Sequence, residues 1–213
     1  MQFQRISAVR HLEFLLMASS EIVAHPLWVN LLILIPVIAF IAWRKDGLQI
    51  GRRPLLLIAV FALAFGFVEA AVVVYLRAAT GLLPGYQGTL TDVQRSAGEF
   101  YKQAEALRSF PQSLLTIEVL REAATMVMLA AVALVSATRA RERLAAFLWA
   151  FAIWDIAYYV FLWATVRWPG SPGDLDVVFL IPVPWLAAVW FPILISTLTL
   201  ASVTLAATNN KKD

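Results

Sequence analysis

Apolar residues fill five stretches of the chain that are each long enough to form a membrane-crossing helix. They are residues 26–43, 54–76, 114–136, 144–166 and 184–206. A helix needs about 20 predominantly apolar residues to span a bilayer, and few residues are left over for a soluble domain. The pattern therefore predicts an all-α integral membrane protein, with residues 1–213 forming a single domain built as a bundle of five transmembrane helices.

Two further helices are expected outside these spans. Thr91 and Gln94 have the spacing of a capping box, which predicts an extracytoplasmic amphipathic helix over residues 92–109. The alternative is a helix that only connects two spans. An interfacial helix is expected near the N-terminus, with a poorly ordered tail as the alternative. Its apolar face would consist of Phe3, Ile6, Val9, Leu12 and Leu16.

Prolines interrupt the last apolar stretch. Residues 177–207 would form a helix of about 46 Å, whereas the hydrocarbon core of a bilayer is about 30 Å thick. Pro182 and Pro184 cannot occupy a regular helix interior, so they predict a break. We expect a short dipping or interfacial segment at 175–181, followed by a span that begins near Pro184 and is kinked at Pro192.

Charge is scarce and lies mostly in loops. Charged residues make up 15% of the chain and hydrophobic residues 61%, with a net charge of +3. Basic residues gather in loops 44–53 and 137–143 and in the C-terminal tail. The positive-inside rule then predicts that the C-terminus lies in the cytoplasm and the N-terminus outside. The expected partner is the lipid bilayer, not nucleic acid, and a homo-oligomer or a membrane-complex partner stays open.

Several chemistries are disfavoured by residue content. The chain has no cysteine and two histidines, so disulfides and thiol nucleophiles are excluded and no metal site is expected. No G-x-S-x-G, H-E-x-x-H or phosphate-loop motif occurs. The sequence specifies no cofactor and leaves open whether the protein is an enzyme.

Acidic residues interrupt three of the predicted spans. Glu118 and Glu122 lie one helical turn apart in the third span, and Arg121 flanks them. Glu69 lies in the second span and Asp155 in the fourth. At 1.5 Å per residue, these carboxyl groups lie about 7 to 18 Å below the predicted outer surface. They should therefore meet in the outer half of the membrane.

The cost of these charges indicates a use for them. A charged residue at the centre of a membrane helix costs roughly 2.5–3.5 kcal/mol. Arg121 can neutralise one or two carboxylates among Glu118, Glu122 and Glu69, so at least two acids keep no cationic partner. Unpaired acids of this kind are typical of proton relays and ligand sites. The alternative is a buried ion pair that only fixes helix register, with Asp155 bonded to Tyr159 or to backbone.

Other side chains are expected to complete this cluster. Tyr158 or Tyr159, beside Asp155, would donate a hydrogen bond. Secondary candidates lie at or near the expected outer mouth. They are Asp174, Asp176, Trp185 and His25.

Four segments carry a resemblance to known sequences: "FGFVEAAVVVYLR", "IEVLREAATMVML", "WDIAYYVFLW" and "RWPGSPGDLDVVFLIPVPW". Over residues 54–196 the chain resembles an uncharacterised group of bacterial multi-pass membrane proteins with no assigned activity. The resemblance favours Glu69, Glu122, Asp155 and the segment 168–185 as one unit. It implies a location in a bacterial inner (plasma) membrane, and it implies no function.

Taken together, these features favour an outward-facing acidic cavity that binds a small ligand or handles protons. A membrane-embedded enzyme acting on a lipid-like substrate at the outer leaflet is one alternative. A structural or assembly subunit, which uses the charges for packing, is the other.

Overall fold

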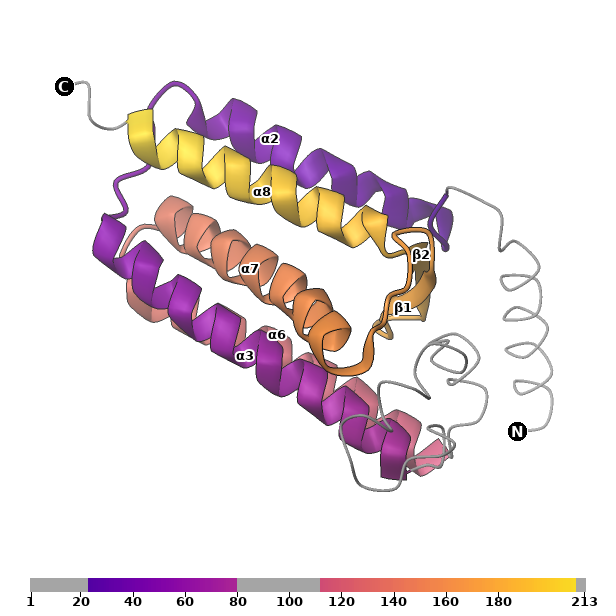
Figure 1. Ribbon diagram of the computed structural model, residues 1–213. Coiled ribbons are helices and arrows are strands. Elements are labelled where there is room, and N and C mark those ends of the chain that lie inside the picture. Colours follow the sequence, from indigo (N-terminus) through magenta and orange to yellow (C-terminus); the bar gives the residue numbers. More distant parts are fainter. Residues whose placement is uncertain (1–22, 80–111, 210–213) are drawn as a thin grey trace.

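The computed structural model describes residues 23–79 and 112–209, which are mostly helical (Figure 1). The predicted N-terminal helix and the helix at 92–109 lie outside these residues. The helices are η1 (Leu27–Ile33), α2 (Leu34–Trp43), α3 (Arg52–Ala79), α6 (Gln112–Ser136), α7 (Ala140–Val166) and α8 (Trp190–Asn209). The strands are β1 (Leu175–Phe179) and β2 (Trp185–Ala188).

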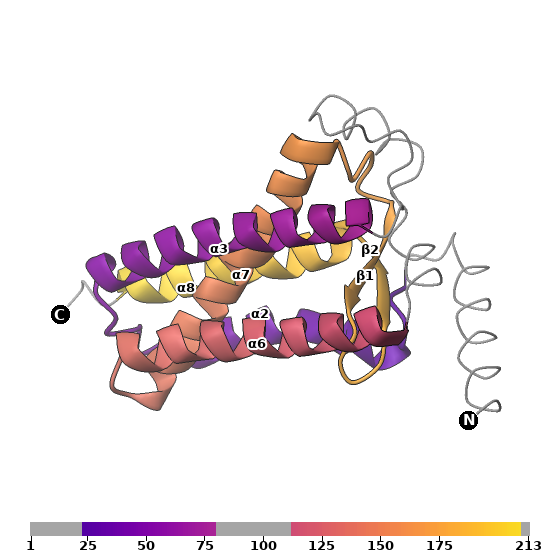
Figure 2. The same cartoon turned by 90° about the horizontal axis from the view of Figure 1, so that it is seen from below.

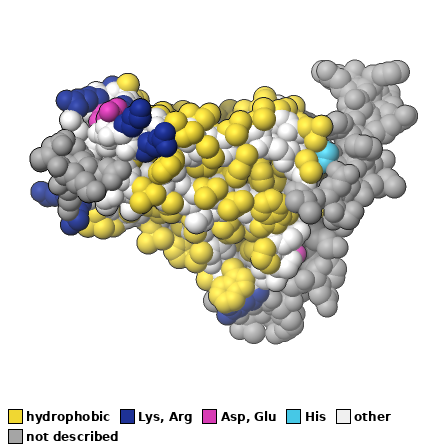
Figure 3. Space-filling model, turned by 90° about the horizontal axis from the view of Figure 1, so that it is seen from above, with side chains coloured by type: hydrophobic (Ala, Val, Ile, Leu, Met, Phe, Trp, Pro, Cys, Tyr) yellow, Lys and Arg dark blue, Asp and Glu magenta, His cyan; other side chains and the backbone are white. Residues whose placement is uncertain are grey.

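Within the described residues, four helices are long and apolar enough to cross a membrane: α3, α6, α7 and α8. On the face seen in Figure 3, hydrophobic side chains cover the middle of the molecule, and Lys and Arg gather mostly at one end. This distribution fits a multi-pass membrane protein, because lipid-facing side chains must be apolar. We call the end formed by residues 44–51 and 137–143 the basic end.

The first predicted span, 26–43, is a shorter apolar segment that changes helix type. It is a 3₁₀ helix over η1 and an α-helix over α2. Pro36 is the third residue of α2 and is buried. The Asn30 amide donates to the carbonyls of Ala24 and Leu27, which ties the start of η1 to the preceding chain.

α7 lies at the centre of the bundle and packs against α3, α6 and α8, while α2 pairs with α8 (Figures 1 and 2). Small residues allow this central position, as Ala146, Ala150 and Ala157 of α7 are buried. Gly66 of α3 makes the closest approach, since a Cβ there would lie 2.7 Å from the Cβ of Ala157. Close helix contact through small residues is typical of membrane bundles.

The predicted break near Pro182 and Pro184 is confirmed and takes the form of a β-hairpin, so the expected start of the last helix near Pro184 is wrong. β1 pairs antiparallel with β2, and both prolines lie in the connection, where no ladder N–H is required. His25 adds a bridge to Leu186, with both backbone hydrogen bonds at 2.8 Å. We call the part of the bundle that carries β1 and β2 the hairpin end.

α8 follows the hairpin and begins at Trp190, six residues after the predicted start. Pro192 therefore lies in its first turn and not in its interior. A backbone N–H at that position would have no helical acceptor, so a proline there costs the helix no hydrogen bond. The kink expected at Pro192 is therefore not required, because the chain changes direction in the hairpin, before α8 begins.

Candidate functional site

Arg121 of α6 binds two carboxylates at the hairpin end. Its guanidinium is ion-paired with Glu69 of α3, and it donates to Glu118 at 2.6 Å from Nη2 and 3.1 Å from Nε. The hydroxyl of Thr125 donates to the second oxygen of Glu69 at 3.1 Å. The sequence predicted that Arg121 neutralises one or two of three glutamates. It binds two, Glu69 and Glu118.

Glu122 faces a different partner. Its Oε2 accepts a hydrogen bond of 2.8 Å from the backbone N–H of Leu180, in the connection between β1 and β2. A residue one helical turn from Glu118 lies on the same side of α6, so the hairpin comes within reach of this carboxylate. Glu122 thereby fastens the hairpin to α6 through a neutral donor.

Asp155 and Asp176 lie deeper and are also bonded by neutral donors. Asp155 of α7 is 6% exposed and accepts a hydrogen bond of 2.8 Å from the hydroxyl of Ser196 on α8. Asp176 of β1 is 2% exposed and accepts one of 2.7 Å from the hydroxyl of Tyr159. Tyr159 therefore bonds to Asp176 and not to Asp155, in contrast to the alternative considered from the sequence.

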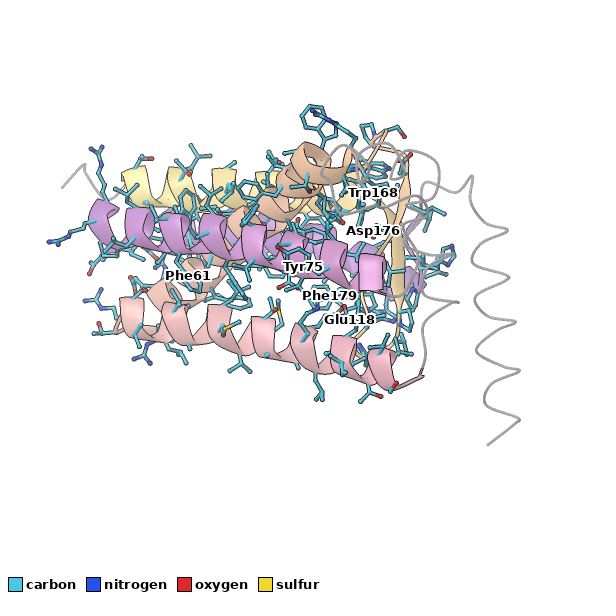
Figure 4. All side chains as sticks on the ribbon, turned by 60° about the horizontal axis from the view of Figure 1, so that its bottom comes forward. Phe61, Tyr75, Glu118, Trp168, Asp176 and Phe179 are labelled. Atoms are coloured by element: carbon cyan, nitrogen blue, oxygen red, sulfur yellow. The ribbon has the colours of Figure 1, made fainter. Side chains whose placement is uncertain are left out.

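A cavity of about 50 Å³ joins these groups. It is lined by Glu69, Arg121, Glu122, Thr125, Trp154, Asp155, Tyr158, Tyr159, Asp176, Val177, Val178 and Phe179. Glu118 does not line the cavity itself but is hydrogen-bonded to Arg121, which does. The side-chain view shows Glu118, Phe179 and Asp176 at the hairpin end (Figure 4). One water requires roughly 10–15 Å³ on this measure, so the cavity takes a few waters or a small ion.

Three secondary candidates do not line the cavity. Asp174 accepts hydrogen bonds from the N–H groups of Gly170 and Ser171, which shapes the loop before β1. Trp185 packs edge-on against Trp28, and His25 pairs through its backbone with β2. Their contacts are those of a folded loop and a strand pair. Asp176, also a secondary candidate, is a buried member of the lining.

The sequence did not identify Ser196, Trp154 and Phe179 as members of the site. The hydroxyls of Thr197 and Thr199 donate to carbonyls of their own helix, α8, whereas that of Ser196 donates to Asp155. For Trp154 the available signal was its position directly before Asp155. Nothing local indicated that Phe179 folds over α7.

The lining carries four carboxyl groups and one guanidinium. Across residues 23–79 and 112–209, no group of three or more His, Asp or Glu is placed to hold a metal ion. No family model, curated protein or solved structure matches the chain. The described fold and this cavity define the class, a mostly helical protein of multi-pass membrane type with an acid-rich cavity at one end.

Proposed function

We propose that the protein is a five-span membrane protein whose acid-rich cavity binds and releases a small ligand, namely a proton or a small cation, from one side of the membrane. The observation that carries the proposal is the charge balance of the lining. Arg121 is engaged by Glu69 and Glu118, while Glu122 and Asp155 accept hydrogen bonds from neutral donors in the described part of the chain. Carboxyl groups in this situation hold a proton or attract a cation.

The length of η1 and α2 supports the fifth span. Seven 3₁₀ residues at about 2.0 Å and ten α-helical residues at about 1.5 Å give roughly 29 Å. That length approaches the roughly 30 Å of the hydrocarbon core, although the segment has only 17 residues. The pairing of α2 with α8 is consistent with a spanning segment.

The basic end supports an outward-facing cavity. Arg44, Lys45 and Arg139 are exposed there, and the α2–α3 and α6–α7 connections that carry them lie at the end opposite the hairpin (Figure 1). By the positive-inside rule this end faces the cytoplasm, and the membrane we propose is a bacterial plasma membrane. The cavity at the hairpin end then opens toward the outside, and its small volume disfavours a bulky lipid-like substrate.

Two neutralising variants test the proposal. Asp155→Asn and Glu122→Gln should keep or raise the midpoint of thermal unfolding in mild detergent, because each removes a carboxyl group that is held at a cost to the fold. In the same samples, an indicator dye should show that each variant exchanges fewer protons with the buffer across neutral pH than the parent does.

The contrary result is equally clear. If both variants lower the midpoint by many degrees and proton exchange is unchanged, the carboxyl groups serve packing. The structural-subunit alternative would then replace the proposed function. Ser196→Ala is a suitable companion variant, since it removes the donor to Asp155 and leaves the carboxyl group in place.

A further inference from the structure

We propose that the ligand of the acid-rich cavity is the ammonium head of a small organic cation, for which methylammonium is the simplest probe. This inference rests on the proposed function, because it names the ligand class of the same cavity. Three properties of the cavity carry it: an accessible carboxylate oxygen, aromatic walls and a small volume.

The carboxylate that favours a cation most strongly is Asp155. It lines the cavity, is nine-tenths buried, and within the described residues accepts one hydrogen bond, from Ser196 to its Oδ2. Its other oxygen keeps its hydrogen-bonding capacity, since a carboxylate accepts at both oxygens. Glu122 offers a second carboxylate on the opposite helix, with one oxygen bonded to Leu180. An ammonium group carries three N–H donors and matches such a pair of acceptors.

The aromatic walls distinguish an organic cation from a metal ion. Trp154 and Tyr158 stack with ring centroids 6.4 Å apart, and Tyr158 meets Tyr159 edge-to-face at 5.1 Å. Phe179 of the hairpin completes the aromatic lining. Ring faces attract ammonium and alkylammonium groups, and tryptophan does so best. Divalent metal ions instead require several oxygen ligands, and the described ranges place no such group of side chains together.

The volume limits the size of the cation. About 50 Å³ admits a head group of a few heavy atoms, given that a single water needs roughly 10–15 Å³. Ammonium and methylammonium fit this space, whereas larger alkylammonium groups fill or exceed it. The lining therefore favours a primary ammonium group, which also supplies the donors that the carboxylates accept.

The experiment is isothermal titration calorimetry on the purified full chain in mild detergent. Methylammonium chloride should bind, and sodium chloride at the same ionic strength should not. Asp155→Asn should weaken methylammonium binding by roughly tenfold to a hundredfold, the value of a hydrogen bond to a charged group. Trp154→Leu should weaken it by roughly threefold to thirtyfold through loss of the ring face.

Glu142→Gln is the matched control. Glu142 is also 6% exposed, but it lies on α7 at the basic end, so its neutralisation should leave methylammonium binding unchanged. The parent alone decides the ligand class if Trp154→Leu fails to fold, because the comparison of methylammonium with sodium needs no variant.

Three outcomes would overturn the inference. An equal response to sodium would assign the cavity to simple cations, and the proposed function would stand. If neither salt binds but proton exchange is lost in Asp155→Asn, the cavity handles protons only. If neither salt binds and proton exchange is the same in every variant, both the ligand class and the proposed function fail.

Discussion

Each end of the bundle has an ion pair between an arginine and an acidic residue, but the pair at the hairpin end is largely buried and the pair at the basic end is largely exposed. At the hairpin end, the side chains of Arg121 and Glu69 are 21% and 7% exposed. At the basic end, Arg141 and Asp46 form an ion pair of 3.3 Å with side chains 33% and 75% exposed. Burial, more than contact distance, decides how much each pair contributes to the free energy of unfolding. Removing one partner from a buried pair leaves a charge that nothing neutralises, whereas water takes over at the surface.

Buried carboxyl groups also differ between the two ends. Glu142 lies in the first turn of α7, where the helix dipole favours an acid, and it accepts a hydrogen bond of 3.4 Å from the N–H of Gln49. Asp155 lies in the middle of the same helix, where the dipole offers no such support. The helix dipole and the Gln49 N–H together stabilise the charge of Glu142, whereas Asp155 has only the hydroxyl of Ser196 as a donor among the described residues.

The largest effect is expected for Arg121→Gln. The substitution leaves Glu69 and Glu118 without their shared cation, which should lower the free energy of unfolding by about 3–5 kcal/mol. Chemical denaturation in mild detergent would measure it. Combining Arg121→Gln with Glu69→Gln and Glu118→Gln should recover much of the loss, since the uncompensated charges are removed together. A fully stable Arg121→Gln single variant would show that the buried pair has no structural weight.

Gly66→Ala should have the next largest effect. The new Cβ would lie 2.7 Å from the Cβ of Ala157 and 3.0 Å from the carbonyl oxygen of Trp154, so α3 and α7 must separate. Overpacking of this kind costs about 1–3 kcal/mol, and it would displace the turn that carries Trp154 and Asp155. Thermal unfolding would measure the cost.

Gly51→Ala is the control for that variant. The nearest atom to a Cβ at Gly51 is Pro54 Cδ at 3.4 Å, an ordinary contact, and the position is exposed. Its midpoint should therefore stay close to that of the parent. If the Gly66 and Gly51 variants unfold alike, close packing of α3 on α7 does not position the cavity.

Local hydrophobicity was sufficient to predict the long helices. The predicted spans 114–136 and 144–166 correspond to α6 and α7 with boundaries that differ by four residues or fewer. The start of the last span could not be found in the same way. Residues 175–188 are apolar enough for a helix, but they form strands because β2 pairs with both β1 and His25, which is distant in sequence.

The same distinction applies to the cavity. Acids within apolar helices stand out in a sequence, so Glu69, Glu122 and Asp155 could be singled out before the fold was known. Their partners could not, because Ser196 and the N–H of Leu180 reach them across the bundle from α8 and the hairpin. Helical periodicity shows which face a residue occupies, and it does not show which element covers that face.

The smallest effect is expected for Asp46→Asn at the basic end. The exposed pair with Arg141 contributes at most about 1 kcal/mol, and salt screens that contribution. Unfolding midpoints of parent and variant should therefore differ by little at low ionic strength and coincide at high ionic strength. The effect of Arg121→Gln should persist in salt, because a buried pair is screened much less. If Asp46→Asn proved as costly as Arg121→Gln, burial would not be what separates the ion pairs at the two ends.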